Sequence, residues 1–533
     1  MFTLPARYGR WVPILAPLAL VFLFLHLHSS LRDSAVIVEP AASNQREANK
    51  TEVDISSACR PLPGIEDVLV ILKTGITEAQ DKVPVHVRTT LRCIPHKLIV
   101  SDYEEDIAGL RTRDVFHNAS ASMLSSDDFA IYHRARSGGR AGLLQQDHTK
   151  VANGPSGMMD NPGWKLDKWK FLPMVQEARA YRPEAKWFVF LEADTYPIWT
   201  NLLAWLAQFD AERQLYIGNQ MQIGESMFAH GGSGFVLSNS AIHNVADLVT
   251  KYPEEWEKIT NAQWAGDCVL GMALSTIHIS LVWSWPHVTT ESVWGQDALG
   301  EGFGKKQWCH PPFTFHHMSP ADVDRMWDFD QKWFSNENHT VLHYGDIFTH
   351  FVRPTLAHHL DNWDNYARDE YKKKNSEGIE IPMTVWDCAE HCASDRACLQ
   401  YRFSDGKCYT SPQALRGTPA PGVESGTLMW RVDAAVAAKE KCEKPFPIPD
   451  SQIANNARGH FILFLNEKFH LAFPLGICPE ENEFLDHTLK IRFVAACLKS
   501  GVVRVQRVLA KRACVGRVTG EEAIEPIFEY FGR

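Results

Sequence analysis

Residues 187–197 place two carboxylates directly after a strand, and no other stretch limits the possible folds as much. Residues 187–191 are uniformly apolar and rich in aromatic and branched side chains, which is typical of a strand buried on both faces. Glu192 and Asp194 follow at once, and Pro197 ends further pairing. Open α/β sheets bind ligands at the carboxyl ends of their strands. Two oxygen ligands there suit a divalent cation that holds phosphate, although such acids often serve only as turn residues or helix caps.

Composition and charge narrow the class of protein. The chain has 533 residues, which suits two or three domains, and its apolar and charged fractions of 45% and 22% are those of a globular protein. The net charge is −10, and no basic block is longer than the three lysines at 372–374. Nucleic acid is therefore not an expected partner.

The N-terminal residues predict a membrane anchor. Arg7 and Arg10 precede an apolar run over residues 11–27 that is interrupted by two prolines and a histidine. Positive charge before the run predicts a cytosolic N-terminus and a lumenal remainder, and the short run suits the thin membranes of the ER or Golgi. A cleaved signal peptide is the alternative, but no clear small-x-small site follows closely. We expect a cytosolic tail and signal anchor in residues 1–33 and a flexible stem in residues 34–58.

Cysteines and sequons fit an oxidising, lumenal compartment. Sequons for N-glycosylation begin at Asn49, Asn118 and Asn338. Four of the twelve cysteines crowd together, namely Cys388, Cys392, Cys398 and Cys408. Dense cysteines in such a compartment predict a small disulfide-stapled module. Zinc is the rival interpretation, but the spacings are not paired C-x-x-C knuckles.

Two strand–helix units open the lumenal part. Residues 68–74 and 96–101 have the pattern of strands, and residues 77–91 that of the helix between them. Such tandem units predict an α/β fold with a parallel, doubly wound sheet. The polar residues at the ends of these strands include Thr74, Gly75 and Asp102.

Periodicity predicts several later elements. Apolar spacing indicates helices over residues 164–181 and 199–209 and a strand over residues 215–219. Residues 118–163 are rich in Ser, Gly, Asn and Asp, so we expect a loop there.

A glycine-rich segment and an acidic helix start follow. Gly231 and Gly232 lie in H-G-G-S-G-F-V-L-S at residues 230–238, where glycine lets the backbone approach a ligand closely; an ordinary structural turn is the alternative. Asp267 lies in the first turn of an apolar helix predicted for residues 265–274, a position where Asp often only caps the helix.

Three histidines gather in a proline-rich segment at residues 308–320. They are His310, His316 and His317. Loop histidines are commonly just solvated, but a histidine near two strand-end acids can complete a metal site.

This order of elements resembles the lumenal β1,3-glycosyltransferases of glycosyltransferase family 31, in particular the fringe and core 1 galactosyltransferase branch in its fungal form. The likeness covers residues 65–350. The matching pieces are V-L-V-I-L-K-T-G at 68–75, the Trp-Lys pairs at 164–165 and 169–170, W-F-V-F-L-E-A-D-T-Y at 187–196, G-G-S-G-F-V-L-S at 231–238, G-D-C-V-L-G at 266–271 and F-H-H-M at 315–318.

The resemblance implies a GT-A type nucleotide-sugar fold and a metal-dependent, inverting transfer. A sugar such as galactose or GlcNAc would pass from a UDP-sugar donor to a glycan or glycoprotein acceptor, forming a β1,3 linkage. Glu192 and Asp194 would hold a divalent cation, Mn²⁺, against the diphosphate. His316 would be the remaining ligand, with His310 and His317 as substitutes.

The same resemblance assigns the donor pocket and the base. Asp267 would be the general base. The residues implied to contact the nucleotide-sugar are Thr74, Gly75, Asp102, Gly231 and Gly232. Sugar-stacking candidates are Trp283, Trp285 and Trp294, for which core packing is the alternative.

Two departures from the family pattern leave two functions open. Glu192-Ala-Asp194 stands where the family usually has three aspartates or D-x-D, and Gly266-Asp267 stands where it commonly has E-D. The first function is an active glycosyltransferase. The second is a lumenal carbohydrate-binding protein of the same fold that has lost catalysis.

The domain organisation follows from these segments. We expect the GT-A-like domain over residues 59–375 and a PAN/apple-like module, which could help hold the acceptor, over residues 380–442. Residues 443–533 resemble nothing recognised, and Glu467-Lys468 splits their apolar runs, so we do not expect a second membrane span there.

Overall fold

The computed structural model describes residues 59–148, 162–442 and 446. The anchor and stem predicted for residues 1–58 lie outside this part, as do residues 447–533. None of the helices in the described part is long and apolar enough to cross a membrane.

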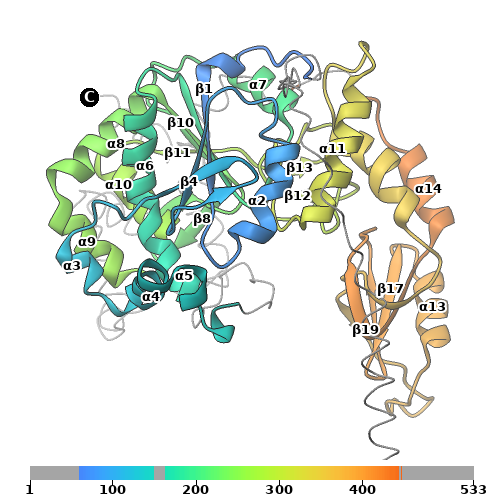
Figure 1. The fold of residues 1–533 in the computed structure, drawn as a ribbon. Helices are drawn as coiled ribbons and strands as arrows, with labels where there is room; N and C mark the ends of the chain where they lie inside the picture. The colour runs from blue at the N-terminus through green and yellow to red at the C-terminus, as the bar shows by residue number, and fades with distance from the viewer. Residues whose placement is uncertain (1–58, 149–161, 443–445, 447–533) are drawn as a thin grey trace, which may run out of the picture. The chain divides into compact units, whose positions relative to one another are not determined.

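An eight-stranded sheet forms the centre of the first domain (Figure 1). From one edge to the other its strands are β11 (Leu281–Trp283), β7 (Tyr216–Gly218), β10 (Phe235–Ser238), β5 (Trp187–Glu192), β1 (Val68–Lys73), β2 (Lys97–Ser101), β4 (Leu110–Asp114) and β3 (Asp106–Ile107).

The sheet is mostly parallel, as the sequence predicts. Strands β5, β1, β2 and β4 run in one direction, whereas β10 is antiparallel to both β5 and β7. All six residues of β1 are buried, which explains why this strand is a continuous apolar run rather than an alternating one. The β1–β5 register sets Lys73 directly beside Glu192, so the ends of these two strands meet at one edge.

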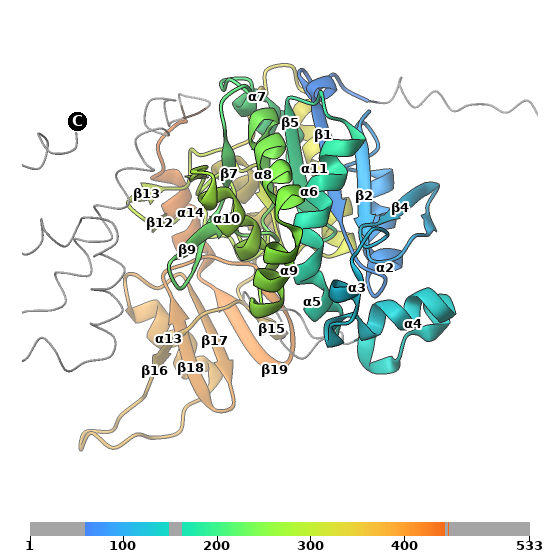
Figure 2. The ribbon, with the colours of Figure 1, turned by 90° about the vertical axis from the view of Figure 1, so that its left-hand side faces the viewer.

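Helices cover both faces of the sheet. One buried cluster packs Leu69 and Ile71 of β1 against α6 (Phe171–Tyr181), α8 (Asn239–Lys251) and α10 (Gly266–Thr276). The other packs Val68 and Val70 against α2 (Ala79–Arg88) and α7 (Trp199–Leu206). Figures 1 and 2 show α6 and α8 side by side along the strands. The predicted α/β fold is therefore confirmed. It has three layers, namely the sheet and a layer of helices on each of its faces.

Smaller elements complete this domain. The further strands are β6 (Tyr196–Pro197), β8 (Gln220–Ile223), β9 (Ser226–Ala229), β12 (Glu301–Gly302), β13 (Lys305–Lys306) and β14 (Thr314–Phe315). The further helices are α3 (Ala121–Leu124), α4 (Ala130–Gly138), α5 (Pro162–Asp167), α9 (Pro253–Ala262), α11 (Pro320–Phe334) and α12 (Tyr344–Ile347).

Two local expectations differ from the structure. The helix predicted for residues 164–181 is interrupted by a 3₁₀ turn, Lys168–Lys170, between α5 and α6. The loop predicted for residues 118–163 is wrong in part, because α3 and α4 lie within it. Its serines begin helical turns: the Ser120 side chain accepts a hydrogen bond from the backbone N–H of Met123, which is the usual role of serine at an N-cap.

The C-terminal part is an antiparallel sheet with one helix packed on it. The strands, in order, are β15 (Leu360–Asp364), β19 (Thr418–Thr427), β17 (Gln400–Ser404), β18 (Lys407–Ser411) and β16 (Asp369–Tyr371), and the helices are α13 (Val385–Ser394) and α14 (Met429–Ala437). Helix α13 packs on β17 and β18. Strands β15 and β16 belong to this sheet although they precede residue 380. We call residues 360–442 the disulfide module.

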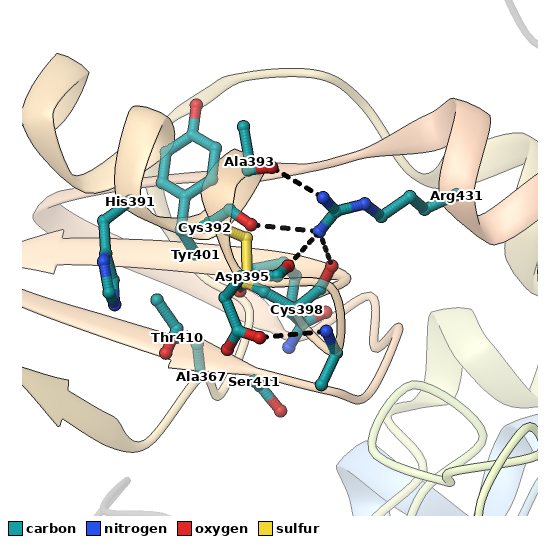
Figure 3. The surroundings of a disulfide bond; sticks show 12 residues. Ala367, His391, Cys392, Ala393, Asp395, Cys398, Tyr401, Thr410, Ser411 and Arg431 are labelled. Carbon is teal, nitrogen blue, oxygen red and sulfur yellow. Dashed lines mark hydrogen bonds between the residues drawn. A yellow bond between two sulfur atoms is a disulfide. The ribbon is translucent and has the colours of Figure 1, made fainter.

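The four crowded cysteines form local disulfides, as predicted. Cys388 pairs with Cys408 and Cys392 with Cys398. Figure 3 shows the guanidinium of Arg431, from α14, beside the second disulfide. It donates to the carbonyls of Cys392 (3.0 Å), Ala393 (2.6 Å), Asp395 and Cys398 (2.8 Å). The carbonyls of Cys392 and Ala393 lie in the last turn of α13, where helical bonds leave carbonyls without partners. Those of Asp395 and Cys398 lie in the segment that follows the helix.

Two further disulfides join more distant segments. Cys59 pairs with Cys93, and Cys309 of the first domain pairs with Cys442 at the end of the module. Cys268 is buried and forms no disulfide within the described part of the chain.

Candidate active site

A short ladder brings the strand-end acids to the histidine segment. Strand β6, which follows Asp194, pairs antiparallel with β14, which precedes His316. The backbone N–H of Met318 donates to the carbonyl of Asp194 at 2.9 Å. As a result His316 Nε2 lies 3.3 Å from Asp194 Oδ1.

Asp194, His316 and His317 form a group that could hold a cation. One ligand atom from each lies within 4.8 Å of the other two. Glu192 is outside this group, because its Oε1 faces Lys73 Nζ at 3.1 Å. His310 is also outside it, with Nδ1 2.8 Å from the carbonyl of Lys306. The structure thus brings together two of the three predicted metal ligands and one of the two substitutes.

The polar atoms of this group fit a metal ion. Asp194 Oδ1 has no closer partner than His316 Nε2 at 3.3 Å, and His316 Nδ1 is buried without a hydrogen-bond partner in the described part of the chain. Buried polar atoms rarely stay unpaired unless an ion, a water or a ligand completes them. One carboxylate and two imidazoles are also ligands that Mn²⁺ and related divalent ions accept.

Two basic side chains, His316 and Lys82, lie beside the Asp194 carboxylate. Burial alone would raise its pKa, but His316 and Lys82 outweigh burial and hold the pKa of Asp194 well below its usual range. Lys82, on α2, places Nζ 3.0 Å from Asp194 Oδ2. Asp194 is therefore ionised at neutral pH, as a metal ligand must be.

The glycine-rich loop lies against this group. A Cβ on Gly232 would come within 2.3 Å of His316 Cε1, and one on Gly231 within 2.7 Å of Phe171 Cζ. The Thr195 hydroxyl donates to the carbonyl of Gly232 at 2.6 Å. Both glycines are therefore required for close packing against Phe171 and His316.

Asp267 contacts the glycine loop at Gly231, next to the Gly232 that packs on His316. Its Oδ2 accepts from the backbone N–H of Gly231, and its Oδ1 accepts from that of Cys268, both at 2.8 Å. The N-cap position of α10 is Ala265, so Asp267 is not the cap residue, although it satisfies one N–H of the first turn. Burial raises the pKa of Asp267 to about 6 despite these two hydrogen bonds. A carboxyl that titrates near neutrality is suited to accepting a proton.

The ends of β1 and β2 also lie together. Asp102 Oδ1 accepts from the backbone N–H of Ile76 at 2.8 Å. Lys170 Nζ is 2.9 Å from Asp102 Oδ2 and donates to the Thr74 carbonyl at 2.8 Å. A Cβ on Gly75 would lie 2.9 Å from the same Nζ. Thr74, Gly75 and Asp102 thus share one buried corner.

Buried lysines are the site residues that sequence reasoning missed. Lys73 is held between Glu192 and Asp167, and Lys170 between Asp102 and Asp167. The signal was present in the sequence, since Lys73 ends an otherwise apolar strand and Lys170 stands between Trp169 and Phe171. A lysine is rarely buried without a charged partner, so each should have been assigned to an acid.

The tryptophan candidates are largely structural. Trp285 is buried and stacks on Trp283, and both rings contact Phe303. Trp294 stacks on Phe351, with ring centroids 5.1 Å apart. These packing contacts account for the three residues without a sugar.

Comparison with known families gives one match. Residues 165–296 match the family model described as Fringe-like. The matched segment includes Glu192, Asp194, Gly231 and Asp267, whereas His316 lies beyond it.

Proposed function

We propose that this chain, in which residues 165–296 form a fringe-like domain of the glycosyltransferase family 31 type with a GT-A fold, is an active inverting glycosyltransferase. A sugar such as galactose or GlcNAc would pass from a UDP-sugar to a glycan hydroxyl, in a β1,3 linkage. The observation that carries the proposal is that one glycine loop contacts both groups. Gly232 packs on His316, which lies beside Asp194, and the backbone N–H of Gly231 donates to Asp267.

The diphosphate end of the donor is assigned to the Asp194 side. Asp194, His316 and His317 would hold a divalent ion, Mn²⁺, which neutralises charge on the departing diphosphate. Glu192 would act indirectly, because its ion pair with Lys73 holds that lysine in place. Thr74, Gly75 and Asp102 are the proposed contacts of the uridine.

The acceptor end is assigned to Asp267. Its carboxylate takes the proton of the acceptor hydroxyl while the hydroxyl oxygen forms a bond to the anomeric carbon. The bond from that carbon to the UDP oxygen breaks on the opposite face, so the configuration inverts. The backbone N–H groups of Gly231 and Cys268 orient the carboxylate for this step.

UDP release from a panel of UDP-sugars, with Mn²⁺ and an acceptor mixture, tests the proposal. At least one donor should release UDP well above a no-enzyme control. The second candidate function, a carbohydrate-binding protein without catalysis, is favoured by the Glu192–Lys73 ion pair, which occupies one of the expected metal ligands. Measurable UDP binding with no release from any donor would establish that second function and exclude the first.

We further propose that this activity is lumenal, in the Golgi or ER, on a single-pass type II membrane protein. The support is the charge pattern of residues 1–33 together with the exposure of the sequon residues Asn118 and Asn338. Endoglycosidase treatment of the protein from a eukaryotic host should increase its electrophoretic mobility. Single Asn118→Gln and Asn338→Gln variants should each remove part of that shift. Unchanged mobility of the wild type would contradict the lumenal assignment.

A further inference from the structure

Tyr366, on the disulfide module, has an unusual backbone and an exposed ring. Its φ is +64°, in the left-handed region that bulky side chains seldom adopt. Its backbone N–H donates to Asp364 Oδ1 at 2.7 Å, and its hydroxyl to the Thr418 hydroxyl at 3.2 Å. The residue is nevertheless 37% exposed. Strained residues that their surroundings hold in place are often functional.

The module holds this ring against a loop of the fringe-like domain. The backbone N–H groups of Arg416 and Gly417 donate to the carbonyl of Trp294 at 3.1 and 3.3 Å. The Arg416 guanidinium stacks on Trp363 at 3.5 Å, and the Trp363 ring N–H donates to the Arg416 carbonyl. A Cβ on the next loop residue, Gly295, would lie 3.7 Å from the Tyr366 ring.

The same loop carries Glu291, which is tied to the candidate active site. The backbone N–H of His316 donates to the Glu291 carbonyl at 3.1 Å. A Cβ on Gly295 would lie 3.3 Å from Glu291 Oε2, so the Glu291 carboxylate and the Tyr366 ring flank one glycine. Both side chains are exposed.

A carboxylate beside an exposed aromatic face is suited to a sugar. The carboxylate accepts hydrogen bonds from hydroxyl groups, and the ring covers the apolar C–H face, as amphipathic aromatic side chains do at polar interfaces.

We propose that Tyr366 and Glu291 together form a subsite for the acceptor glycan, so that the disulfide module takes part in choosing the acceptor. The inference rests on the proposed transferase function. It goes beyond the Fringe-like match, because Tyr366 lies outside residues 165–296. The occupant is a neutral pyranoside whose hydroxyls face Glu291.

Two variants separate binding from folding. Tyr366→Gly removes the ring but suits the left-handed backbone, because glycine adopts it freely. Tyr366→Phe keeps the ring and loses only the hydroxyl contact. Trp386→Ala is the matched control, since this ring is 71% exposed on α13 of the same module and contacts His359 instead.

The probes are p-nitrophenyl glycosides of galactose, N-acetylgalactosamine, glucose, N-acetylglucosamine, mannose and fucose. UDP release is measured with water alone and with each glycoside, using the most active UDP-sugar. Tyr366→Gly should raise the KM of the best glycoside by about tenfold, as loss of a central aromatic anchor does, and leave water-driven release unchanged. Tyr366→Phe and Trp386→Ala should match the wild type.

An unchanged glycoside KM in Tyr366→Gly would overturn the inference, as would an equal rise in Trp386→Ala. Loss of water-driven release in Tyr366→Gly would also overturn it, because that step needs no acceptor subsite. Failure of the proposed function has a different signature: the wild type itself would release no UDP with any donor.

Discussion

At the scale of single residues, Asp267 has the property that an inverting transfer needs from a base. Burial raises its pKa to about 6, while the backbone N–H groups of Gly231 and Cys268 keep the carboxylate oriented. The sequence placed Asp267 in the first turn of a helix but could not separate a base from a cap. The two roles are told apart by the hydrogen bond from the backbone N–H of Gly231 to Asp267. That contact joins residues far apart in sequence, so it cannot be read from the sequence.

Asp267→Asn should lower kcat by about 10²–10⁴, the usual contribution of a positioned acid or base, and leave UDP affinity nearly unchanged. In the wild type, kcat should fall as the pH drops below about 6, because the carboxyl with its raised pKa is then protonated. The residual activity of the variant should not show this fall in kcat at low pH. Near-normal turnover in Asp267→Asn would show that the residue only serves the first turn of α10.

At the scale of elements, the sequence predicts buried strands and apolar helices well. It does not predict features that depend on hydrogen bonds from particular side chains. The run 68–74 became β1 and the run 187–191 became β5, because both-face burial leaves a clear apolar pattern. The loop predicted for residues 118–163 contains α4 instead. In the same segment Ser120 caps α3 and Ser126 caps the 3₁₀ turn Asp127–Phe129 before α4, and composition alone does not distinguish a capping serine from a loop serine.

The end of α13 also depends on a distant partner, Arg431. Arg431→Met leaves four carbonyls without this donor and should destabilise the helix end by about 1–2 kcal/mol, because net hydrogen bonds contribute about 1 kcal/mol and this site is only partly buried. Hydrogen exchange of the amides in residues 385–398 should speed up accordingly. Arg396→Met, at a neighbouring exposed arginine, is the control. Equal exchange in both variants would mean that Arg431 does not hold the helix end.

At the scale of the whole molecule, the candidate site is assembled from segments that are far apart in sequence. Lys73 ends β1, Asp194 follows β5, Asp267 begins α10 and His316 follows β14. The residue types and order of Asp194, Asp267 and His316 could be predicted from the sequence through the family resemblance, whereas Lys73 was missed. The pairing of Glu192 with Lys73 could not, because it depends on the β1–β5 register. The disulfide module likewise recruits β15 and β16 from residues that local patterns assign to the preceding domain.

Calorimetric titration of UDP, with Mn²⁺ and with EDTA, tests the central proposal most directly. Wild-type protein should bind UDP far more tightly with Mn²⁺. Asp194→Ala and His316→Ala should each weaken this Mn²⁺-dependent binding by more than about tenfold, since even loss of an outer-shell partner costs that much. Glu192→Gln should have a smaller effect, because Glu192 faces Lys73. Asp247→Ala, at an exposed acid of α8, should have none. If Asp194→Ala binds UDP with Mn²⁺ as tightly as the wild type, Asp194 is a solvated turn residue and the proposed site is contradicted.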